Sequence, residues 1–195
     1  MMRLIFATNN QHKVNEIRNA LSGSYNIISL KEAGIDKDIP EPHDTLAANA
    51  TEKSTVIFEM TGENCFSEDT GLEVDAINGA PGVYSARYAG ENASFSDNVE
   101  KLLKEMEGKS IRDAKFKTVI SLIIDGKETQ FIGECAGKIT EKVMGNNGFG
   151  YDPVFIPDGA DNTFAEMTME EKKVFSHRAK AVEKLVLFLK GVRLS

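Results

Sequence analysis

The chain has 195 residues, of which 41% are hydrophobic and 27% charged, with 30 acidic side chains against 23 basic ones and a formal charge of −7. This composition excludes intrinsic disorder and is typical of a folded globular protein. The negative charge disfavours sequence-independent binding to nucleic acids or anionic membranes, because such a surface repels polyanions. The two cysteines, Cys65 and Cys135, cannot build a disulfide framework and indicate buried thiols in a reducing compartment.

The chain opens with a predicted buried strand and a helix. Leu4 to Ala7 is a continuous apolar run, which is typical of a strand covered on both faces. The run is shorter than the apolar region of a signal peptide, and no run approaches the ~18 residues of a membrane span. Val14, Ile17 and Leu21 then recur at helical spacing after a polar loop. We therefore expect a cytoplasmic protein that begins with strand, loop and helix.

Two helices, a short strand and a hairpin are predicted in the middle of the chain. Thr45 is placed to cap a helix that runs to about Thr61, and Ser96 is placed to cap a second helix. Between these helices, a short strand is predicted over Cys65-Phe66-Ser67. The alternating runs 118–124 and 129–135 flank an Asp-Gly turn, which predicts a β-hairpin.

Two further helices are predicted near the carboxyl end. Thr168 and Glu171 have the spacing of a capping box, and Ser176 is placed to cap a last helix that Gly191 ends. Because strands and helices are mixed along the chain, and the hairpin breaks a regular βαβ repeat, we predict an α/β fold with a mixed sheet. No linker is long enough to separate two domains, so residues 1–195 are expected to form one domain.

The polar loop Thr8-Asn9-Asn10-Gln11-His12-Lys13 is the first candidate site. Backbone N–H groups and the helix dipole attract anions at a helix N-terminus, and Lys13 adds a full positive charge. This arrangement is able to bind phosphate, but the loop lacks the spacing of a P-loop, and taken alone it favours the alternative that follows. A plain asparagine-capped helix with an exposed lysine is the alternative.

Acidic side chains form the second candidate site. Glu68 and Asp69 follow the short apolar strand and precede Thr70, and Glu41 lies between two prolines. Mg²⁺ prefers hard oxygen ligands, often one or two carboxylates together with phosphate oxygens of the substrate. A carboxylate held near such an ion can also accept a proton from an attacking water. A solvated turn is the alternative.

The segment Gly148-Phe149-Gly150-Tyr151-Asp152-Pro153 is the third candidate site. Glycines around an aromatic ring let the backbone approach a flat ligand, and the Phe149 ring can stack on a base. A glycine-rich turn with Phe149 and Tyr151 in the core is the alternative, and for Tyr151 it is the expectation.

Basic side chains near the carboxyl end form the fourth candidate site. Two potential cations, His177 and Arg178, occupy the first turn of a predicted helix, where they oppose its dipole, so a ligand-binding reason is plausible. Arg178 can donate to a keto oxygen or a phosphate, and Lys172 to a phosphate. Solvated side chains are the alternative.

Taken in order, these motifs resemble the inosine triphosphate pyrophosphatase family, and the likeness runs from Arg3 to Lys190. The residues that carry it are Thr8-Asn9-Asn10 with Lys13, Glu41 with Thr45, Asn49-Ala50 and Lys53, Ser67 to Leu72, Gly79 to Gly90, Gly148 to Pro153, and Lys172 with Ser176-His177-Arg178.

The resemblance implies an elongated mixed α/β fold, with helices flanking the sheet and two lobes around a central cleft, usually in a homodimer. It implies Mg²⁺-dependent hydrolysis of the non-standard purine triphosphates ITP, dITP and XTP between the α and β phosphates. The products would be a nucleoside monophosphate and pyrophosphate, which removes these nucleotides from the pool. Neither a nucleic acid nor a membrane is an expected partner.

The resemblance also implies roles for the candidate residues. Asp69 matches the proposed general base and, with Glu41 and Glu68, the surroundings of the metal. The loop from Thr8 to Lys13 matches a phosphate-contacting loop. The positions that match residues around the base and phosphates are Thr70, Phe149 to Asp152, Lys172, His177 and Arg178.

Two alternative functions stay open from the sequence. One is a related pyrophosphatase that prefers modified pyrimidine or other nucleotides, and the other is a nucleotide-binding regulator without turnover. The three carboxylates favour the enzyme, because binding a polyphosphate alone does not require them.

Overall fold

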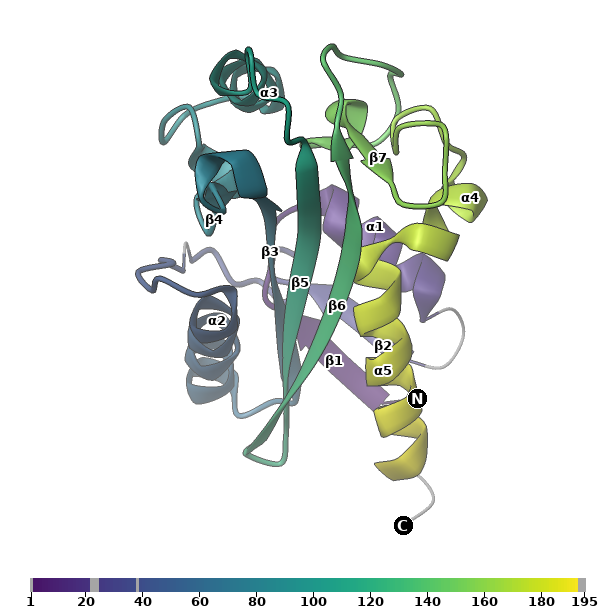
Figure 1. The fold of residues 1–195 in the computed structure, drawn as a ribbon. Helices are drawn as coiled ribbons and strands as arrows, with labels where there is room; N and C mark the ends of the chain where they lie inside the picture. Colours follow the sequence, from purple (N-terminus) through teal and green to yellow (C-terminus); the bar gives the residue numbers. More distant parts are fainter. Residues whose placement is uncertain (1, 22–24, 38, 193–195) are drawn as a thin grey trace. The chain divides into compact units, whose positions relative to one another are not determined.

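The computed structural model describes residues 2–21, 25–37 and 39–192 (Figure 1). The elements in chain order are β1 (Met2–Phe6), α1 (Gln11–Ala20), β2 (Tyr25–Ser29), α2 (Leu46–Thr61), β3 (Cys65–Val74), β4 (Pro81–Gly82), α3 (Phe95–Glu105), β5 (Asp113–Ile124), β6 (Lys127–Ile139), β7 (Phe155–Pro157), α4 (Met169–Phe175) and α5 (His177–Val192). A transmembrane helix is absent from this described part of the chain, because each helix there is too short or too polar.

One mixed sheet contains the described strands, in the order β2-β1-β3-β5-β6-β7, with β4 paired to β3. β1 runs parallel to both β2 and β3, whereas β4 and β7 run antiparallel to β3 and β6 respectively. β5 and β6 follow one another through a turn at Asp125 and Gly126, both of which have positive φ. The predicted hairpin and the mixed α/β class with flanking helices are therefore confirmed, and the hairpin strands are longer than predicted.

The chain divides into two compact units. The first contains residues 1–69, 118–133 and 180–195, and the second contains residues 70–117 and 134–179. Each unit has its own apolar core. That residues 1–195 form one domain stays a prediction.

In the first unit, strand alternation distributes apolar side chains to two faces of the sheet. Leu4 and Phe6 of β1 belong to a cluster with residues of α1 and α5, whereas Ile5 of β1 belongs to a cluster with Ile57 of α2. This division follows from the period of two along a strand. Helices α1 and α5 thus cover one face of the sheet in this unit, and α2 covers the other.

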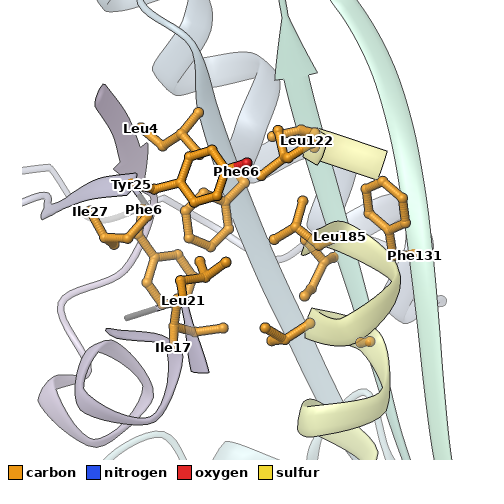
Figure 2. Packing of buried hydrophobic residues seen from close by; sticks show 14 of the residues in the cluster. Leu4, Phe6, Ile17, Leu21, Tyr25, Ile27, Phe66, Leu122, Phe131 and Leu185 are labelled. Carbon is orange, nitrogen blue, oxygen red and sulfur yellow. The ribbon is translucent and has the colours of Figure 1, made fainter. Parts of the chain in front are cut away.

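Aromatic packing fixes the ends of the two central strands of the first unit. The rings of Phe6 and Phe66 stack with centroids 4.4 Å apart and an interplanar angle of 10°, next to Leu4 and Leu185 (Figure 2). Burying each ring contributes about 1.5–3 kcal/mol. Because Phe6 and Phe66 lie two residues before Thr8 and Glu68, this packing places two of the candidate sites.

The second unit is built around three packed aromatic rings. Phe116 lies with its centroid 4.7 Å from that of Phe155, and Phe155 lies 5.3 Å from Phe164. The amphipathic helix α3 buries its apolar face in the same cluster. Ser94, not Ser96, caps α3, because Asp97 lies three residues after Ser94 and completes a capping box with it.

The last helix continues through the residue predicted to end it. The helical structure of α5 reaches Val192, at the edge of the described residues, so the prediction that Gly191 ends the helix was wrong. A glycine is tolerated in a final turn, where its cost is about 1 kcal/mol and no left-handed conformation is needed.

A surface hydrogen-bond cluster predicts a pH-dependent contribution to stability. Glu32 Oε2 accepts hydrogen bonds from Arg18 Nη2 at 2.5 Å and from the Ser29 N–H and Oγ at 2.8 and 2.9 Å. These donors, Arg18 foremost, lower the pKa of Glu32 from 4.5 to about 2. Because the folded pKa lies below the unfolded one, this stabilisation is complete above pH 4.5 and is lost as the pH falls towards 2.

We expect Glu32→Gln to lower the free energy of unfolding by about 1 kcal/mol or less at pH 7, since the carboxylate is half exposed. The difference from wild type should shrink as the pH falls below 4.5. Denaturant titrations at several pH values measure it. A difference that does not change with pH would contradict the role of the Glu32 charge.

Candidate active site

In the first unit, the predicted polar loop connects β1 to α1. Asn10 caps α1, because its side-chain oxygen accepts hydrogen bonds from the N–H groups of His12 and Lys13 at 3.0 and 3.3 Å. The N–H of Asn10 donates to Thr8 Oγ1 at 3.1 Å. The capped-helix alternative is therefore correct for these two N–H groups, and the main attraction this loop offers a phosphate is the Lys13 charge. Two other loop residues, Asn9 and Gln11, are exposed.

The carboxylates Glu68 and Asp69 lie inside β3. This strand runs unbroken from Cys65 to Val74, so the predicted strand of three residues was too short. The Glu68 side chain is fully buried and that of Asp69 is 7% exposed, which excludes the solvated-turn alternative. Because successive strand residues point to opposite faces, Glu68 shares the face of Phe66, and Asp69 shares the face of Cys65. Each carboxylate therefore meets a different helix.

A lysine from each of these helices pairs with a carboxylate. Lys13 of α1 has its Nζ 3.6 Å from Glu68 Oε1. Lys53 of α2 donates from Nζ to Asp69 Oδ1 at 2.9 Å, to the Glu68 carbonyl at 2.9 Å and to Glu41 Oε1 at 2.6 Å. Burying a charge is costly unless it is paired and hydrogen-bonded, so these lysines explain how a strand tolerates two adjacent acids.

Glu41 reaches Lys53 from the segment that precedes α2. Asn49, which is fully buried on α2, accepts a hydrogen bond from the His43 N–H at 2.9 Å and donates to the His43 carbonyl at 3.2 Å. Thr45 caps α2 as predicted, by accepting from the Ala48 N–H at 3.1 Å. The buried amide of Asn49 thus holds the Glu41 segment against the helix that carries Lys53.

The ion pairs described above join three carboxylates to two ammonium groups. Burial raises the pKa of Asp69, Lys53 opposes the rise, and the charge of Glu41 adds to it. Burial alone would lower the pKa of Lys53, but Asp69 and Glu41 together raise it. Oδ2 of Asp69 is buried and accepts a hydrogen bond from none of the described residues. Asp69 is therefore a buried proton acceptor with one oxygen held by Lys53.

A protein-only metal centre is not preformed in the described ranges, where no three or more His, Cys, Asp or Glu side chains are grouped to hold an ion. Mg²⁺ sites at nucleotides often use only one or two carboxylates, with water and phosphate oxygens completing the coordination. The expected ligands Glu41, Glu68 and Asp69 stay predictions.

In the second unit, the loop from Gly148 to Asp152 folds around a buried carboxylate. Asp152 Oδ2 accepts hydrogen bonds from the Phe149 N–H at 2.9 Å and from Lys172 Nζ at 2.7 Å. Gly148 has φ +75°, and a Cβ at this position would lie 2.0 Å from Asp152 Oδ2. Only glycine fits there, and Asp152 orients both the loop and the lysine.

The two cations of this unit that contact Phe149 are buried. Lys172 is 5% exposed and Arg178 is 4% exposed, so the solvated alternative is wrong for both. Lys172 Nζ and Arg178 Cζ each lie 5.4 Å from the Phe149 ring centroid. The structure thus brings together three of the residues predicted to surround the nucleotide.

His177 is buried at the start of α5. Its ring stacks on Phe116, with centroids 4.6 Å apart and an interplanar angle of 12°. Ser176 caps the helix as predicted, because its Oγ accepts from the Ala179 N–H at 3.3 Å. The stacked ring fixes the helix start from which Arg178 projects.

The remaining predicted residues have less direct roles in these contacts. Tyr151 is 4% exposed and donates its hydroxyl to the Ser85 carbonyl at 2.9 Å, which confirms that it belongs to the core. Burial raises the pKa of this hydroxyl. Thr70 follows Asp69 on β3 and is half-buried, and Gly150 has positive φ.

Lys53 is a functional candidate that the residue patterns alone did not single out. It appears in the sequence only as part of the family motif, without a role. The position of Lys53 could have indicated a role, because it lies three residues after Ala50 and four before Ile57, on the apolar face of α2. A lysine on a buried face requires a buried counter-charge.

The fold and the two clusters define a class of protein. It is a mixed α/β protein with buried, perturbed ionisable groups in two clusters, which is typical of enzyme active sites. A family model described as the Ham1 family matches residues 4–188. The chain belongs to the Ham1 family, and the resemblance seen in its motifs is confirmed.

Named relatives match nearly the whole chain. A dITP/XTP pyrophosphatase of Flavobacterium johnsoniae is 50% identical over 192 residues, which are 98% of this chain and 100% of the relative. One from Porphyromonas gingivalis is 50% identical and covers 97% of this chain and 98% of its own. The solved Ham1 protein of Staphylococcus aureus has a TM-score of 0.88, with 39% identity over 97% of this chain and 98% of that chain. A HAM1 protein from Coxiella burnetii has a TM-score of 0.90, with 34% identity over 98% and 100%.

Proposed function

We propose that this protein hydrolyses the non-standard purine triphosphates dITP, ITP and XTP to the nucleoside monophosphate and pyrophosphate. The observation that carries the proposal is the environment of the Asp69 carboxylate. The carboxylate is buried, its Oδ1 accepts a hydrogen bond from Lys53 Nζ, and burial raises its pKa. The names of full-length relatives, dITP/XTP pyrophosphatase, support the choice of substrate.

In this proposal the first unit acts on the triphosphate. Asp69 accepts the proton of the water that attacks the α phosphorus, and Lys53 fixes the orientation of its carboxylate. Lys13 supplies positive charge towards the departing pyrophosphate. A raised pKa brings a carboxylate closer to the neutral range, in which a general base works best.

Mg²⁺ is part of the proposal, with Glu41, Glu68 and Asp69 as the residues that would hold it. Asp69 Oδ2 fits this role, because it is a hard, buried oxygen to which no described residue donates a hydrogen bond. When bound, Mg²⁺ would supply charge neutralisation and polarisation of phosphoryl oxygens.

In the second unit, we assign the base to Phe149 and Arg178. The Phe149 ring would stack on the purine, and Arg178 would donate to the keto oxygen at position 6. Lys172, held by Asp152, would contact a phosphate, and His177 would line the base.

The proposal also includes a homodimer and a cytoplasmic location. Light scattering coupled to size exclusion tests the first, with twice the monomer mass expected, and cell fractionation tests the second.

The direct test is release of pyrophosphate from dITP, XTP and ATP. We expect rapid release from dITP and XTP, little from ATP, and none after EDTA treatment until Mg²⁺ is restored. Ca²⁺ should support the reaction poorly, since its longer and looser coordination misplaces the phosphates. EDTA saturated beforehand with Mg²⁺ is the control. Full activity in free EDTA would refute the metal requirement, and tight nucleotide binding without release would favour the regulator.

Arg178→Ala separates recognition of the base from recognition of phosphate. An arginine that donates to the keto oxygen faces the amino group of adenine donor to donor, and an unpaired buried donor costs about 1–3 kcal/mol or more. We therefore expect kcat/KM to fall about ten- to a hundredfold more for dITP than for dATP. Arg3→Ala, which removes a half-exposed arginine, is the control. Equal losses for both nucleotides would assign Arg178 to the phosphates.

A further inference from the structure

The aromatic ring assigned to the base stands on a glycine-rich loop whose backbone is held by Asp152. Phe149 lies between Gly148 and Gly150, and these glycines and Gly145 all have positive φ. Phe149 itself is half-buried. Because the backbone of this loop is held, the direction of the ring depends on the side-chain torsions of Phe149 and therefore on the groups that pack against the ring.

Two of those groups are cations that a nucleotide would attract. Lys172 Nζ and Arg178 Cζ each lie 5.4 Å from the Phe149 centroid. Their charges interact with the oxygens of a bound nucleotide as well as with the ring. A contact that orients the Phe149 ring without depending on charge must come from an apolar side chain.

Phe95 is such a side chain. Its ring centroid lies 5.9 Å from that of Phe149, with an interplanar angle of 44°, in the tilted range that aromatic pairs prefer. Phe95 is nevertheless 46% exposed. Phe95 lies outside the sequence motifs that carry the family resemblance.

The backbone that carries Phe95 is firmly held. Phe95 is the first residue of α3, directly after Ser94, whose side chain forms a capping box with Asp97. Asn98, one turn further on, donates to the Ala86 carbonyl at 3.1 Å and accepts from the Ala89 N–H at 2.7 Å. A ring on a rigid helix start therefore contacts a ring on a glycine loop.

We propose that Phe95 is a positioning residue for base recognition, which holds the Phe149 ring in the orientation that stacks on the purine. This inference rests on the proposed function. Phe95 acts through Phe149, and it touches neither the phosphates nor the reacting atoms, so it affects substrate affinity and not the chemical step.

The test compares Phe95→Ala, Phe95→Tyr and wild type in steady-state hydrolysis of dITP. We expect Phe95→Ala to raise KM about three- to tenfold, the range of one aromatic pair, with kcat within about twofold. Inhibition by dIMP should weaken by the same factor, while inhibition by pyrophosphate stays unchanged. Phe95→Tyr, which keeps the ring, should have the wild-type KM for dITP and the wild-type inhibition by dIMP. Ile111→Ala removes another exposed apolar side chain of the same unit and should change neither.

Two results would overturn the inference. One is an unchanged KM and dIMP inhibition in Phe95→Ala. The other is a parallel loss of kcat, pyrophosphate inhibition and thermal stability, which would make Phe95 a merely structural residue. Wild-type protein that releases no pyrophosphate from dITP would instead refute the proposed function itself, before any variant is compared.

Discussion

Asp69→Asn should lower kcat for dITP by about 10²- to 10⁴-fold, the usual cost of losing a general base, while dITP still binds. Asparagine has the shape of aspartate and keeps an oxygen that can accept the hydrogen bond from Lys53 Nζ, now 2.9 Å from Asp69 Oδ1. It cannot take a proton from water. Steady-state kinetics measures kcat, and calorimetric titration with dITP measures binding, which we expect to be unchanged or tighter.

Asp75→Asn is the matched control, because it makes the same chemical change at an exposed aspartate shortly after β3. It should retain wild-type kcat. Near-normal kcat in Asp69→Asn would contradict the general-base role. Loss of dITP binding together with kcat would instead make Asp69 a binding residue.

Lys53→Met should destabilise the protein by about 3–5 kcal/mol, since it leaves two carboxylates without their shared buried counter-charge. Lys53 is 8% exposed and donates to both Asp69 and Glu41. Its folded pKa lies above 10.5, so the stabilisation is complete at neutral pH and is lost only as the pH rises through that higher value. Denaturant titration at pH 7 measures the change.

A double-mutant cycle with Asp69→Asn sharpens this test. If the cost arises from the uncompensated Asp69 charge, the double variant should recover part of the stability that Lys53→Met loses. Lys31→Met, at an exposed position of the first unit, is the control and should fall within about 0.5 kcal/mol of wild type. Additive losses in the cycle would contradict a coupled buried pair.

Elements specified by local pattern could be predicted from the sequence. The apolar run from Leu4, the helix between Thr45 and Thr61, and the hairpin around Asp125 are each encoded by residues close together in the chain. Capping boxes are local as well, and the miss at α3 was a choice between Ser94 and Ser96 in one short segment.

The site could be predicted only in part, because its partners are distant in sequence. Two adjacent acids left a solvated turn open as an alternative, yet Glu68 and Asp69 lie in a strand, where Lys13 and Lys53 reach them from separate helices. Lys53 is 16 residues from Asp69, and no local pattern indicates that pairing. The stacking of His177 on Phe116 is equally non-local. The order of the motifs identified the family. The pairing of the charged side chains in the site, in contrast, depends on tertiary packing.

The most direct test of the account is the position of ¹⁸O after hydrolysis of dITP in H₂¹⁸O. Attack of water at the α phosphorus predicts dIMP and pyrophosphate in equal amounts, with the label in dIMP and none in pyrophosphate. Mass spectrometry of both products measures this. Label in pyrophosphate, or dIDP and inorganic phosphate as products, would contradict the proposed reaction.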